Sequence, residues 1–228
     1  KKRIENNIPY GLLGINIGPN KDTSNMVNDF LDCAETFFPL GDYVTINISS
    51  PNTKGLRDFH NSDSLKELLS KINDIRDKSN YKKSFLLKIS PDLEDSFIEN
   101  IIELALQHNI NGLILTNTTD QNRENLLDDK KIEKGGLSGR PIKDLSTECI
   151  KKFYKVLKGK IPIIGVGGVD SGKSAFEKLS AGASAVQLYT GMIYKGPTIV
   201  KEIKKELIYI MKSKGIKNIK EIIGTNIK

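Results

Sequence analysis

The stretch IPIIGVGGVDSGKSAFEKLSAGASAVQLYT, residues 161–190, decides the fold because it holds a complete strand–helix–strand unit. The runs IPIIGVG (161–167) and SAVQLYT (184–190) are continuously apolar, as in strands buried on both faces of a parallel arrangement. Between them, SGKSAFEKLSAG (171–182) has apolar residues at helical spacing and closes on a glycine placed like a helix C-cap. This order predicts a βα repeat with parallel strands.

The same unit recurs along the chain. Four further strand-like runs precede this stretch: LLGINIG (12–18), YVTINIS (43–49), SFLLKIS (84–90) and NGLILTN (111–117). Helical patterns occur at 24–38, 63–75, 95–109, 145–157 and 198–215, with no linker or low-complexity break. Such a rhythm favours either an open doubly wound sheet or a (β/α)8 barrel.

Chain length bears on this choice. A barrel needs eight units and about 250 residues. The chain has 228 residues, and its start, KKRIENNIPYG, has neither a methionine nor a strand pattern. We therefore expect a chain cut from a longer protein, with the two further units of a barrel lying before its first residue.

Composition excludes several classes of function. The chain is 38% hydrophobic and 28% charged, as expected for a soluble globular protein. The net charge of +7 comes from basic residues scattered among acidic ones, without interleaved aromatics, so we expect a solvated surface and no nucleic-acid partner. Cys33, Cys149, His60 and His108 are unclustered, which predicts neither a disulfide framework nor a metal site. The longest apolar runs are too short to cross a bilayer.

Polar side chains gather where the predicted strands end, which is where parallel α/β folds carry their working groups. They are Asn16, Asn47, Ser49, Ser50, Asn52, Lys88, Thr116, Asn117, Thr118, Tyr189 and Thr190. Asparagine, serine and threonine supply both donors and acceptors, so they suit a planar, hydrogen-bonding heterocycle. A single lysine among uncharged groups would stabilise negative charge on a ligand. The alternative for each asparagine is turn formation at a strand end.

One connection is unusually long. TDQNRENLLDDKKIEKGGLSGRPIKD, residues 119–144, precedes the fifth strand. Long connections in compact domains are usually functional or disordered. This one contains a glycine pair followed by Ser138-Gly139, a composition suited to close approach of backbone to a ligand.

Six segments in chain order carry a family resemblance. They are NISSPNTKGLR (47–57), LLKISPDL (86–93), LTNTT (115–119), GGLSGRPIKDLST (135–147), IIGVGG (163–168) and AGASAVQLYTG (181–191). Together they resemble class 2 dihydroorotate dehydrogenase, a family of FMN-dependent (β/α)8 barrels. The resemblance implies a single FMN-binding barrel domain over residues 1–228, supplying strands 3 to 8. The family's first two strands, and its N-terminal helices for quinone and membrane contact, would be absent from this chain.

The resemblance also implies an activity and a location. It implies oxidation of dihydroorotate to orotate on FMN, with electrons passed to a membrane quinone, in de novo pyrimidine (UMP) biosynthesis. The enzyme would be a peripheral membrane protein, either on the cytoplasmic side of a bacterial inner membrane or on the mitochondrial inner membrane.

Site residues follow from the same resemblance. Ser50 would be the catalytic base. The cofactor-binding residues would be Asn16, Asn47, Lys88, Thr116, Ser138, Gly139, Gly167, Gly168, Tyr189 and Thr190. The substrate-binding residues would be Asn47, Asn52, Asn117 and Thr118. Related soluble enzymes, which pass electrons to fumarate or NAD, use cysteine as the base, so serine at position 50 favours the quinone-linked class.

The letters Gly167 to Ser174 also spell G-x-x-x-x-G-K-S, the phosphate loop of nucleotide hydrolases. Such an enzyme needs an acidic residue at the end of another strand to hold Mg²⁺, and the other predicted strands end in Asn, Ser, Thr or Tyr. Barrels bind phosphate with the loops after strands seven and eight. We therefore expect Gly167 and Gly168 to approach a flavin phosphate, aided by a helix N-terminus, with Lys173 and Ser174 facing solvent.

Three alternatives remain open at this point. The chain could belong to another FMN barrel that acts on a pyrimidine, or it could be a non-catalytic fragment. ATP hydrolysis that depends on Lys173 would restore the nucleotide-hydrolase interpretation.

Overall fold

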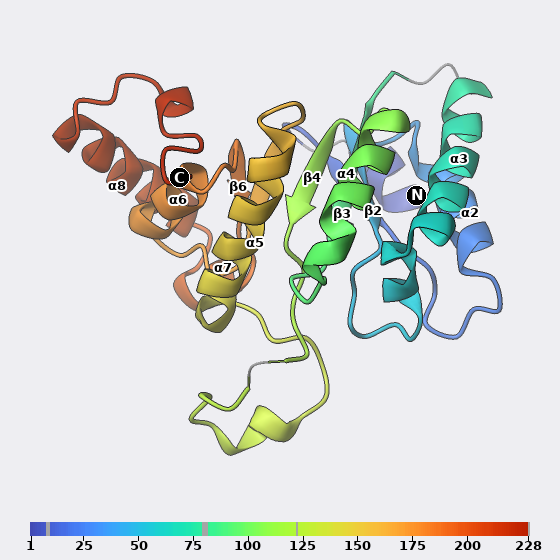
Figure 1. The fold of residues 1–228 in the computed structure, drawn as a ribbon, viewed down its shortest axis with the longest axis horizontal. Coiled ribbons are helices and arrows are strands. Elements are labelled where there is room, and N and C mark those ends of the chain that lie inside the picture. Colours follow the sequence, from blue (N-terminus) through green and yellow to red (C-terminus); the bar gives the residue numbers. More distant parts are fainter. Residues whose placement is uncertain (8–9, 79–81, 122, 228) are drawn as a thin grey trace. The chain divides into compact units, whose positions relative to one another are not determined.

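The computed structural model describes residues 1–7, 10–78, 82–121 and 123–227, and the chain divides into two compact units. Unit 1 comprises Lys1–Ile89 and Leu93–Leu113, and unit 2 comprises Ser90–Asp92 and Ile114–Lys228. Figure 1 colours the chain from blue through green for unit 1 and from green to red for unit 2. Within each unit strands and helices alternate along the chain, as the sequence predicts.

Unit 1 contains parallel strands in sequence order. Strand β1 (Gly14–Ile17) pairs with β2 (Tyr43–Asn47), and β2 pairs with β3 (Ser84–Ile89). The register places Asn16 beside Thr45 and Asn47 beside Lys88. The helical elements are α1 (Lys2–Asn6), α2 (Met26–Phe37), η1 (Leu56–His60), α3 (Ser62–Lys78), η2 (Asp95–Phe97) and α4 (Ile98–Gln107), where η denotes a 3-10 helix.

The core of unit 1 follows from helical periodicity. The buried residues of α3 are Leu65, Leu68, Leu69 and Ile72. Their spacing of three and four residues puts all four on one face of the helix. Phe38, directly after α2, meets Phe85 of β3 edge to face, with ring centroids 4.6 Å apart. Burial of these apolar side chains fixes α2 and α3 on the strands that carry the predicted site residues.

Strand β4 (Gly112–Leu115) carries the chain from unit 1 into unit 2. There β5 (Ile163–Val166) pairs in parallel with β6 (Ala185–Gln187). The helical elements of unit 2 are η3 (Asp129–Ile132), η4 (Arg140–Ile142), α5 (Lys143–Leu157), α6 (Gly172–Ser180), α7 (Thr190–Lys195), α8 (Ile199–Ser213) and η5 (Ile219–Glu221). Across the described residues of the whole chain, no helix is long and apolar enough to span a membrane.

Helices α6 and α8 lie side by side in unit 2 (Figure 1). Val169 and Ala175 are buried against Ile199 and Ile203, both of α8. Gly172, the first residue of α6, allows this close approach because a β-carbon there would collide with Glu206 of α8. The two helices therefore form one packed layer beside β6.

Hydrogen bonds stabilise the β4–α5 connection both at its base and within the loop. Thr119 and Leu137 exchange backbone hydrogen bonds of 3.2 and 2.6 Å, forming an antiparallel bridge. Within the loop, the Arg123 guanidinium donates to the carbonyl oxygens of Glu133 (2.6 Å) and Gly135. The predicted connection 119–144 is therefore largely ordered by its own contacts, although its residue 122 lies outside the described residues.

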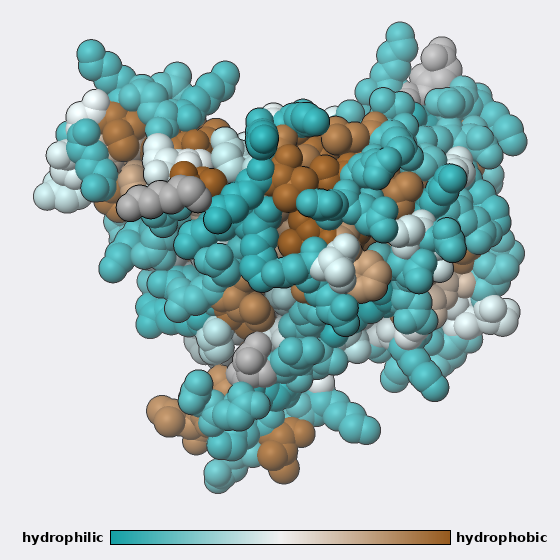
Figure 2. Space-filling view, viewed as in Figure 1, coloured by the Kyte–Doolittle hydropathy of each residue, from teal (hydrophilic) through white to brown (hydrophobic). Residues whose placement is uncertain are grey.

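The same connection exposes apolar side chains. Leu127 and Ile132 are 100% and 86% exposed. Figure 2 shows brown, hydrophobic atoms on the surface of the segment at the bottom of the view. The backbone bridge at its base and the hydrogen bonds of Arg123 thus order this loop.

The predicted elements are largely confirmed, with three differences. All six strands are present, each shorter than its apolar run, and the five quoted helical patterns and 171–182 all contain helices. The expectation of burial on both faces is wrong for β1 and β6, in which Asn16 and Ala185 are exposed. Among the described strands these two stand at the ends of the strand order, so each has one neighbour. The short helices α1 and α7 do not follow from the sequence patterns, since neither contains a full apolar period.

Candidate active site

The end of β2 in unit 1 bends through a local hydrogen-bond network. The Asn47 carboxamide oxygen accepts hydrogen bonds from the backbone N–H (3.3 Å) and the hydroxyl (3.0 Å) of Ser49. These bonds turn the chain directly after the strand, as asparagine commonly does. Ser49 is fully buried, whereas the next residue, Ser50, is half-buried and therefore reachable by a ligand.

Ser50 accepts a hydrogen bond through its hydroxyl oxygen. The donor is the backbone N–H of Asn52, 3.2 Å away. A donor directed at this oxygen stabilises negative charge on it, because hydrogen bonding to the charged form favours that form. The side chain of Asn52 itself is exposed. The geometry thus suits a serine that gives up its proton.

Lys88 of β3 lies beside Asn47 in the strand register. It is half-buried, and desolvation lowers the pKa of its ammonium group. Asn16 of β1 lies beside Thr45 of β2. Thr45 comes two residues before Asn47, so the side chains of Thr45 and Asn47 point to the same face of the sheet. Unit 1 therefore gathers Asn16, Asn47 and Lys88 at the carboxyl ends of its strands, as predicted.

In unit 2, the segment after β4 is anchored by Asp92. The Thr119 hydroxyl, which is fully buried, donates to the Asp92 carboxylate over 2.5 Å. Just before it, the Asn117 side-chain oxygen accepts the backbone N–H of Thr118 over 2.8 Å. The buried hydroxyl of Thr116 has no hydrogen-bond partner among the described residues. An unpaired buried hydroxyl is costly, so Thr116 is suited to a bound polar group.

Three loops of unit 2 converge on a glycine cradle. The hydroxyl groups of Ser138 and Thr190 lie 2.8 Å apart and share a hydrogen bond. Gly139 has a φ of +80°, and a β-carbon there would stand 2.9 Å from the Thr190 methyl carbon. Only glycine fits such a left-handed and closely packed position without strain. Tyr189, the residue before α7, is 77% exposed.

The second part of the cradle is Gly167-Gly168, after β5. Their φ values are +113° and +72°, and a β-carbon on Gly168 would come 2.5 Å from Cβ of Lys143. A β-carbon on Gly167 would come 2.9 Å from Cβ of Ser146. The pair is thus pressed against the first turn of α5. In the described part of the chain, the N–H groups of Gly139 and Gly168 make no internal hydrogen bond and are available to an anion.

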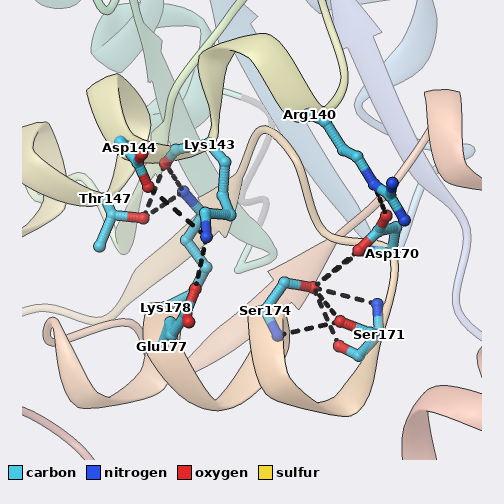
Figure 3. A network of polar contacts seen from close by, with 9 residues as sticks. All are labelled: Arg140, Lys143, Asp144, Thr147, Asp170, Ser171, Ser174, Glu177 and Lys178. Atoms are coloured by element: carbon cyan, nitrogen blue, oxygen red, sulfur yellow. Dashed lines mark hydrogen bonds and ion pairs between the residues drawn. The ribbon is translucent and has the colours of Figure 1, made fainter.

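An ion pair links these two loops (Figure 3). Arg140 Nε lies 2.5 Å from the Asp170 carboxylate. Partial burial would raise the pKa of Asp170, but the hydrogen bond and charge of Arg140, with the charge of Lys195, outweigh it and lower that pKa. Lys195 Nζ also donates to the Asp170 carbonyl over 2.9 Å. Asp170 therefore ties the loop after β5 to η4 and to α7.

The start of α6 is contacted by a protein carboxylate. The Gly172 N–H donates to the Glu206 carboxylate over 2.5 Å, so a protein anion already occupies this helix N-terminus. Lys173 is exposed, as predicted. The prediction for Ser174 is wrong: its side chain is buried and forms a capping box with Ser171 (Figure 3). The Ser174 hydroxyl is held by local hydrogen bonds to Asp170 and Ser171, whereas the contact with Glu206, 34 residues from Gly172, places a protein carboxylate where the flavin phosphate was expected at the α6 N-terminus.

Similarity to known proteins extends over most of the chain. The family model of dihydroorotate dehydrogenase matches residues 1–211. The chain belongs to the dihydroorotate dehydrogenase family. The mouse protein "Dihydroorotate dehydrogenase (quinone), mitochondrial" is 44% identical over 216 residues, which cover 94% of this chain and 55% of that protein. The protein from Idiomarina loihiensis named "Dihydroorotate dehydrogenase (quinone)" is 45% identical over 212 residues, which cover 90% and 63% of the two chains.

Solved structures agree with this dihydroorotate dehydrogenase assignment. The structure of DHODH from Eimeria tenella in complex with ferulenol superposes with a TM-score of 0.90 at 37% identity. The match covers 99% of this chain and 65% of that one. The predicted fold class, a (β/α)8 TIM barrel of which this chain carries six βα units, is thereby confirmed. The chain spans 55% to 63% of the length of the two curated relatives described above.

The sequence analysis missed several residues that shape this candidate site. They are Asp92, Arg140, Asp170, Lys178 and Glu206. Only Lys178 left a detectable signal, since it falls three residues after Ala175 on the apolar face of α6. The others act through contacts between residues 25 to 34 positions apart, which a local pattern does not reveal.

Proposed function

We propose that this chain is the larger part of an FMN-dependent dehydrogenase that oxidises dihydroorotate to orotate and passes the electrons to a quinone. The observation that carries the proposal is the Ser50 hydroxyl, which accepts the Asn52 N–H directly after the strand end formed by Asn47 and Lys88. Family membership supports the substrate. The names of the mouse and Idiomarina relatives, which include the word quinone, support the acceptor.

The residues present fit FMN. Gly139 and Gly168 form a cradle that a β-carbon would fill, and their N–H groups suit a phosphate. Ser138, Thr190 and the backbone of Gly167 and Tyr189 would complete the contacts at the phosphate end. The unpartnered hydroxyl of Thr116 suits a polar edge of the ring. When bound, FMN supplies an acceptor for the hydride that leaves C6 of dihydroorotate.

Ser50 would take the proton from C5 of dihydroorotate. A serine hydroxyl is a weak base, so it must pass its own proton to a water molecule or a neighbouring hydroxyl as it takes the proton from C5. The hydrogen bond from the Asn52 N–H supports this role because it stabilises the developing alkoxide. Serine, in place of the cysteine of the soluble relatives, favours the quinone-linked class.

Lys88 and the asparagines would hold the two ligands. Lys88 would place positive charge where negative charge accumulates on the flavin, and its partial desolvation strengthens that interaction. Asn16 and Asn47 would hold the flavin ring. Asn47, Asn52, Asn117 and Thr118 would bind the pyrimidine, since carboxamides and hydroxyls supply donors and acceptors to its edges.

The arrangement of the whole protein is also a proposal. By resemblance, residues 1–228 supply strands 3 to 8 of the barrel, and an N-terminal region supplies the first two strands and the quinone and membrane contacts. The location would be a mitochondrial inner membrane or the cytoplasmic face of a bacterial inner membrane. The mitochondrial names of the mouse and rice relatives support the former for eukaryotic members.

The test is an anaerobic titration of the intact protein. Its visible spectrum is recorded, and dihydroorotate is then added without an electron acceptor. A flavin band that bleaches supports the cofactor, the substrate and the first half-reaction together. A flavin band that persists would direct the search to another pyrimidine substrate. A protein that purifies without flavin and does not bind added FMN would contradict the proposal.

A further inference from the structure

Lys178, at the end of the second turn of α6, has no exposed surface. Its ammonium group donates hydrogen bonds to the Lys143 carbonyl and to the Thr147 hydroxyl, each over 2.8 Å (Figure 3). Both acceptors are neutral and lie in the first turns of α5. Within the described residues, Lys178 forms no ion pair, whereas its neighbour Glu177 pairs with Lys143 over 3.1 Å.

The space that holds Lys178 is built into the sheet. Gly165 of β5 has no side chain, and a β-carbon there would stand 3.3 Å from Cβ of Lys178 and 3.0 Å from Ile150 of α5. The aliphatic stem therefore lies between β5 and α5. Burial of an ammonium group without a carboxylate is costly. That cost lowers the pKa of Lys178 to about 7, with burial as the largest cause.

The turn that Lys178 supports is also the wall of the glycine cradle. A β-carbon at Gly168 would stand 2.8 Å from Cα of Lys143, whose carbonyl accepts the Lys178 hydrogen bond. Ser146, in the same helix, donates its hydroxyl to the Val166 carbonyl directly before Gly167. The first turn of α5 thus sets the conformation of the loop after β5. Lys178 stabilises this turn through its hydrogen bond to the Lys143 carbonyl.

We propose that Lys178 is a positioning residue for the phosphate of the flavin: it holds the first turn of α5 against Gly167-Gly168 and places a buried positive charge behind that loop. This inference rests on the proposed function, which supplies the phosphate. A charge at this place has an effect that a neutral side chain lacks, because it attracts an anion through a medium of low dielectric constant. The negative charge of a phosphate dianion would compensate the positive charge of the Lys178 ammonium group.

The ionisation of Lys178 gives this role a pH dependence. The charged or titratable groups that face it are Lys143, Asp144 and Cys149 of α5 and Glu177 of its own helix. A bound phosphate favours the protonated ammonium, so it raises the pKa of Lys178. The affinity for FMN should therefore fall as pH rises above about 7, whereas the affinity for riboflavin, which has no phosphate, should not.

The experiment compares FMN with riboflavin. Dissociation constants of both ligands for the intact apoprotein are measured by quenching of flavin fluorescence, for the wild type and for Lys178→Met. We expect Lys178→Met to weaken FMN binding by about ten- to hundredfold. Riboflavin binding should be unchanged. The matched control is Lys173→Met, an exposed lysine of the same helix, which should leave both constants unchanged.

Other outcomes separate this inference from the proposed function. Equal losses of FMN and riboflavin affinity would assign Lys178 a purely structural role and overturn the inference. An unchanged preference for FMN over riboflavin in Lys178→Met would do the same. Failure of the wild type to bind either flavin would instead contradict the proposed function, and the inference with it.

If Lys178→Met does not fold, two further measurements still test the inference. Thr147→Val removes one of the two acceptors of the Lys178 ammonium and should reduce FMN affinity in the same direction by a smaller factor. In the wild type, the ratio of FMN to riboflavin affinity should fall between pH 7 and pH 9. The Cys149→Ala variant should retain that fall, which excludes the thiol as its source. A ratio that does not change with pH would contradict the inference.

Discussion

The backbone N–H of Asn52 lies 3.2 Å from the hydroxyl oxygen of Ser50 and donates a hydrogen bond to it. This bond both closes the turn after β2 and directs a donor at the atom that would carry negative charge during proton abstraction. Turn formation and catalysis therefore require the same local structure. The sequence allows two roles for the polar residues at strand ends, turn formation and ligand chemistry. At Ser50 the two roles are compatible.

Replacement of Ser50 tests its role as the base. We expect Ser50→Ala to bind flavin normally and to lose about two to four orders of magnitude in the rate of flavin reduction by dihydroorotate. Stopped-flow reduction under anaerobic conditions measures this rate. Ser49→Ala is the comparison, because Ser49 is buried and its hydroxyl donates to Asn47: it should weaken ligand binding but should leave the reduction step of the bound complex near the wild-type rate. A reduction rate in Ser50→Ala equal to that of the wild type would show that another group is the base.

Replacement of Lys88 should have opposite effects on the stability of the protein and on the rate of flavin reduction. Burial lowers the pKa of Lys88, so the charged form is less favourable in the folded than in the unfolded chain. The stability of the wild type should therefore rise as pH increases toward the unfolded pKa of lysine. We expect Lys88→Met to be more stable than the wild type at pH 7 yet slower in flavin reduction. Thermal unfolding and stopped-flow reduction measure the two effects.

The control for Lys88 is Lys82→Met, since Lys82 is exposed just before the same strand. It should change neither the unfolding temperature nor the reduction rate. A Lys88→Met variant that reduces its flavin at the wild-type rate would remove the proposed electrostatic role of this lysine.

Gly168 offers a test of the glycine cradle. Its φ of +72° and the 2.5 Å approach of Lys143 Cβ leave no room for a side chain. We expect Gly168→Ala to lower the free energy of unfolding by roughly 2–4 kcal/mol and to abolish measurable FMN binding. Gly159 has a similar φ of +78°, but a β-carbon there would meet nothing within 4 Å, so Gly159→Ala should retain FMN binding. Retention of FMN by Gly168→Ala would place the phosphate elsewhere.

The sequence predicts the elements of this fold better than their contacts. Strands and helices follow from apolar runs and from spacings such as Leu65, Leu68 and Ile72, which are local properties of the chain. The positions of Ser50 and Lys88 at strand ends follow from the same patterns. The occupation of the α6 N-terminus by Glu206 depends on the packing of α8, because Gly172 and Glu206 are 34 residues apart along the chain. Local periodicity contains no information on such pairings.

Lys178 and Thr116 show that hydrogen-bond partners of buried polar groups also cannot be predicted from the sequence. The position of Lys178 on an apolar helix face indicates burial, but its acceptors on α5 depend on a glycine in β5 that leaves room for the side chain. The family resemblance predicts Thr116 as a cofactor contact, but the lack of a partner for its hydroxyl among the described residues is visible only in three dimensions. Satisfaction of buried polar groups is a property of the packed structure.

The last prediction concerns His60, the buried end of η1. It is 7% exposed, and its Nε2 has no hydrogen-bond partner among the described residues. Burial, with a smaller contribution from the charge of Arg57, lowers the pKa of His60 from 6.5 to about 4. The folded chain therefore keeps His60 neutral at a pH where the unfolded chain binds a proton. Stability should fall as pH decreases from 6.5 to 4, by about 3 kcal/mol.

Removal of the imidazole should remove this pH dependence. We expect His60→Leu to lose less stability than the wild type between pH 7 and pH 4, as measured by urea denaturation at each pH. His108→Gln is the comparison, because His108 is partly exposed and hydrogen-bonds to Asn73; burial also lowers the pKa of His108, so this variant should reduce the slope as well, but by less than His60→Leu. If His60→Leu and the wild type have the same slope, the acid sensitivity arises from carboxylates instead. A reduced slope would show that the buried His60 contributes to the acid sensitivity of unit 1.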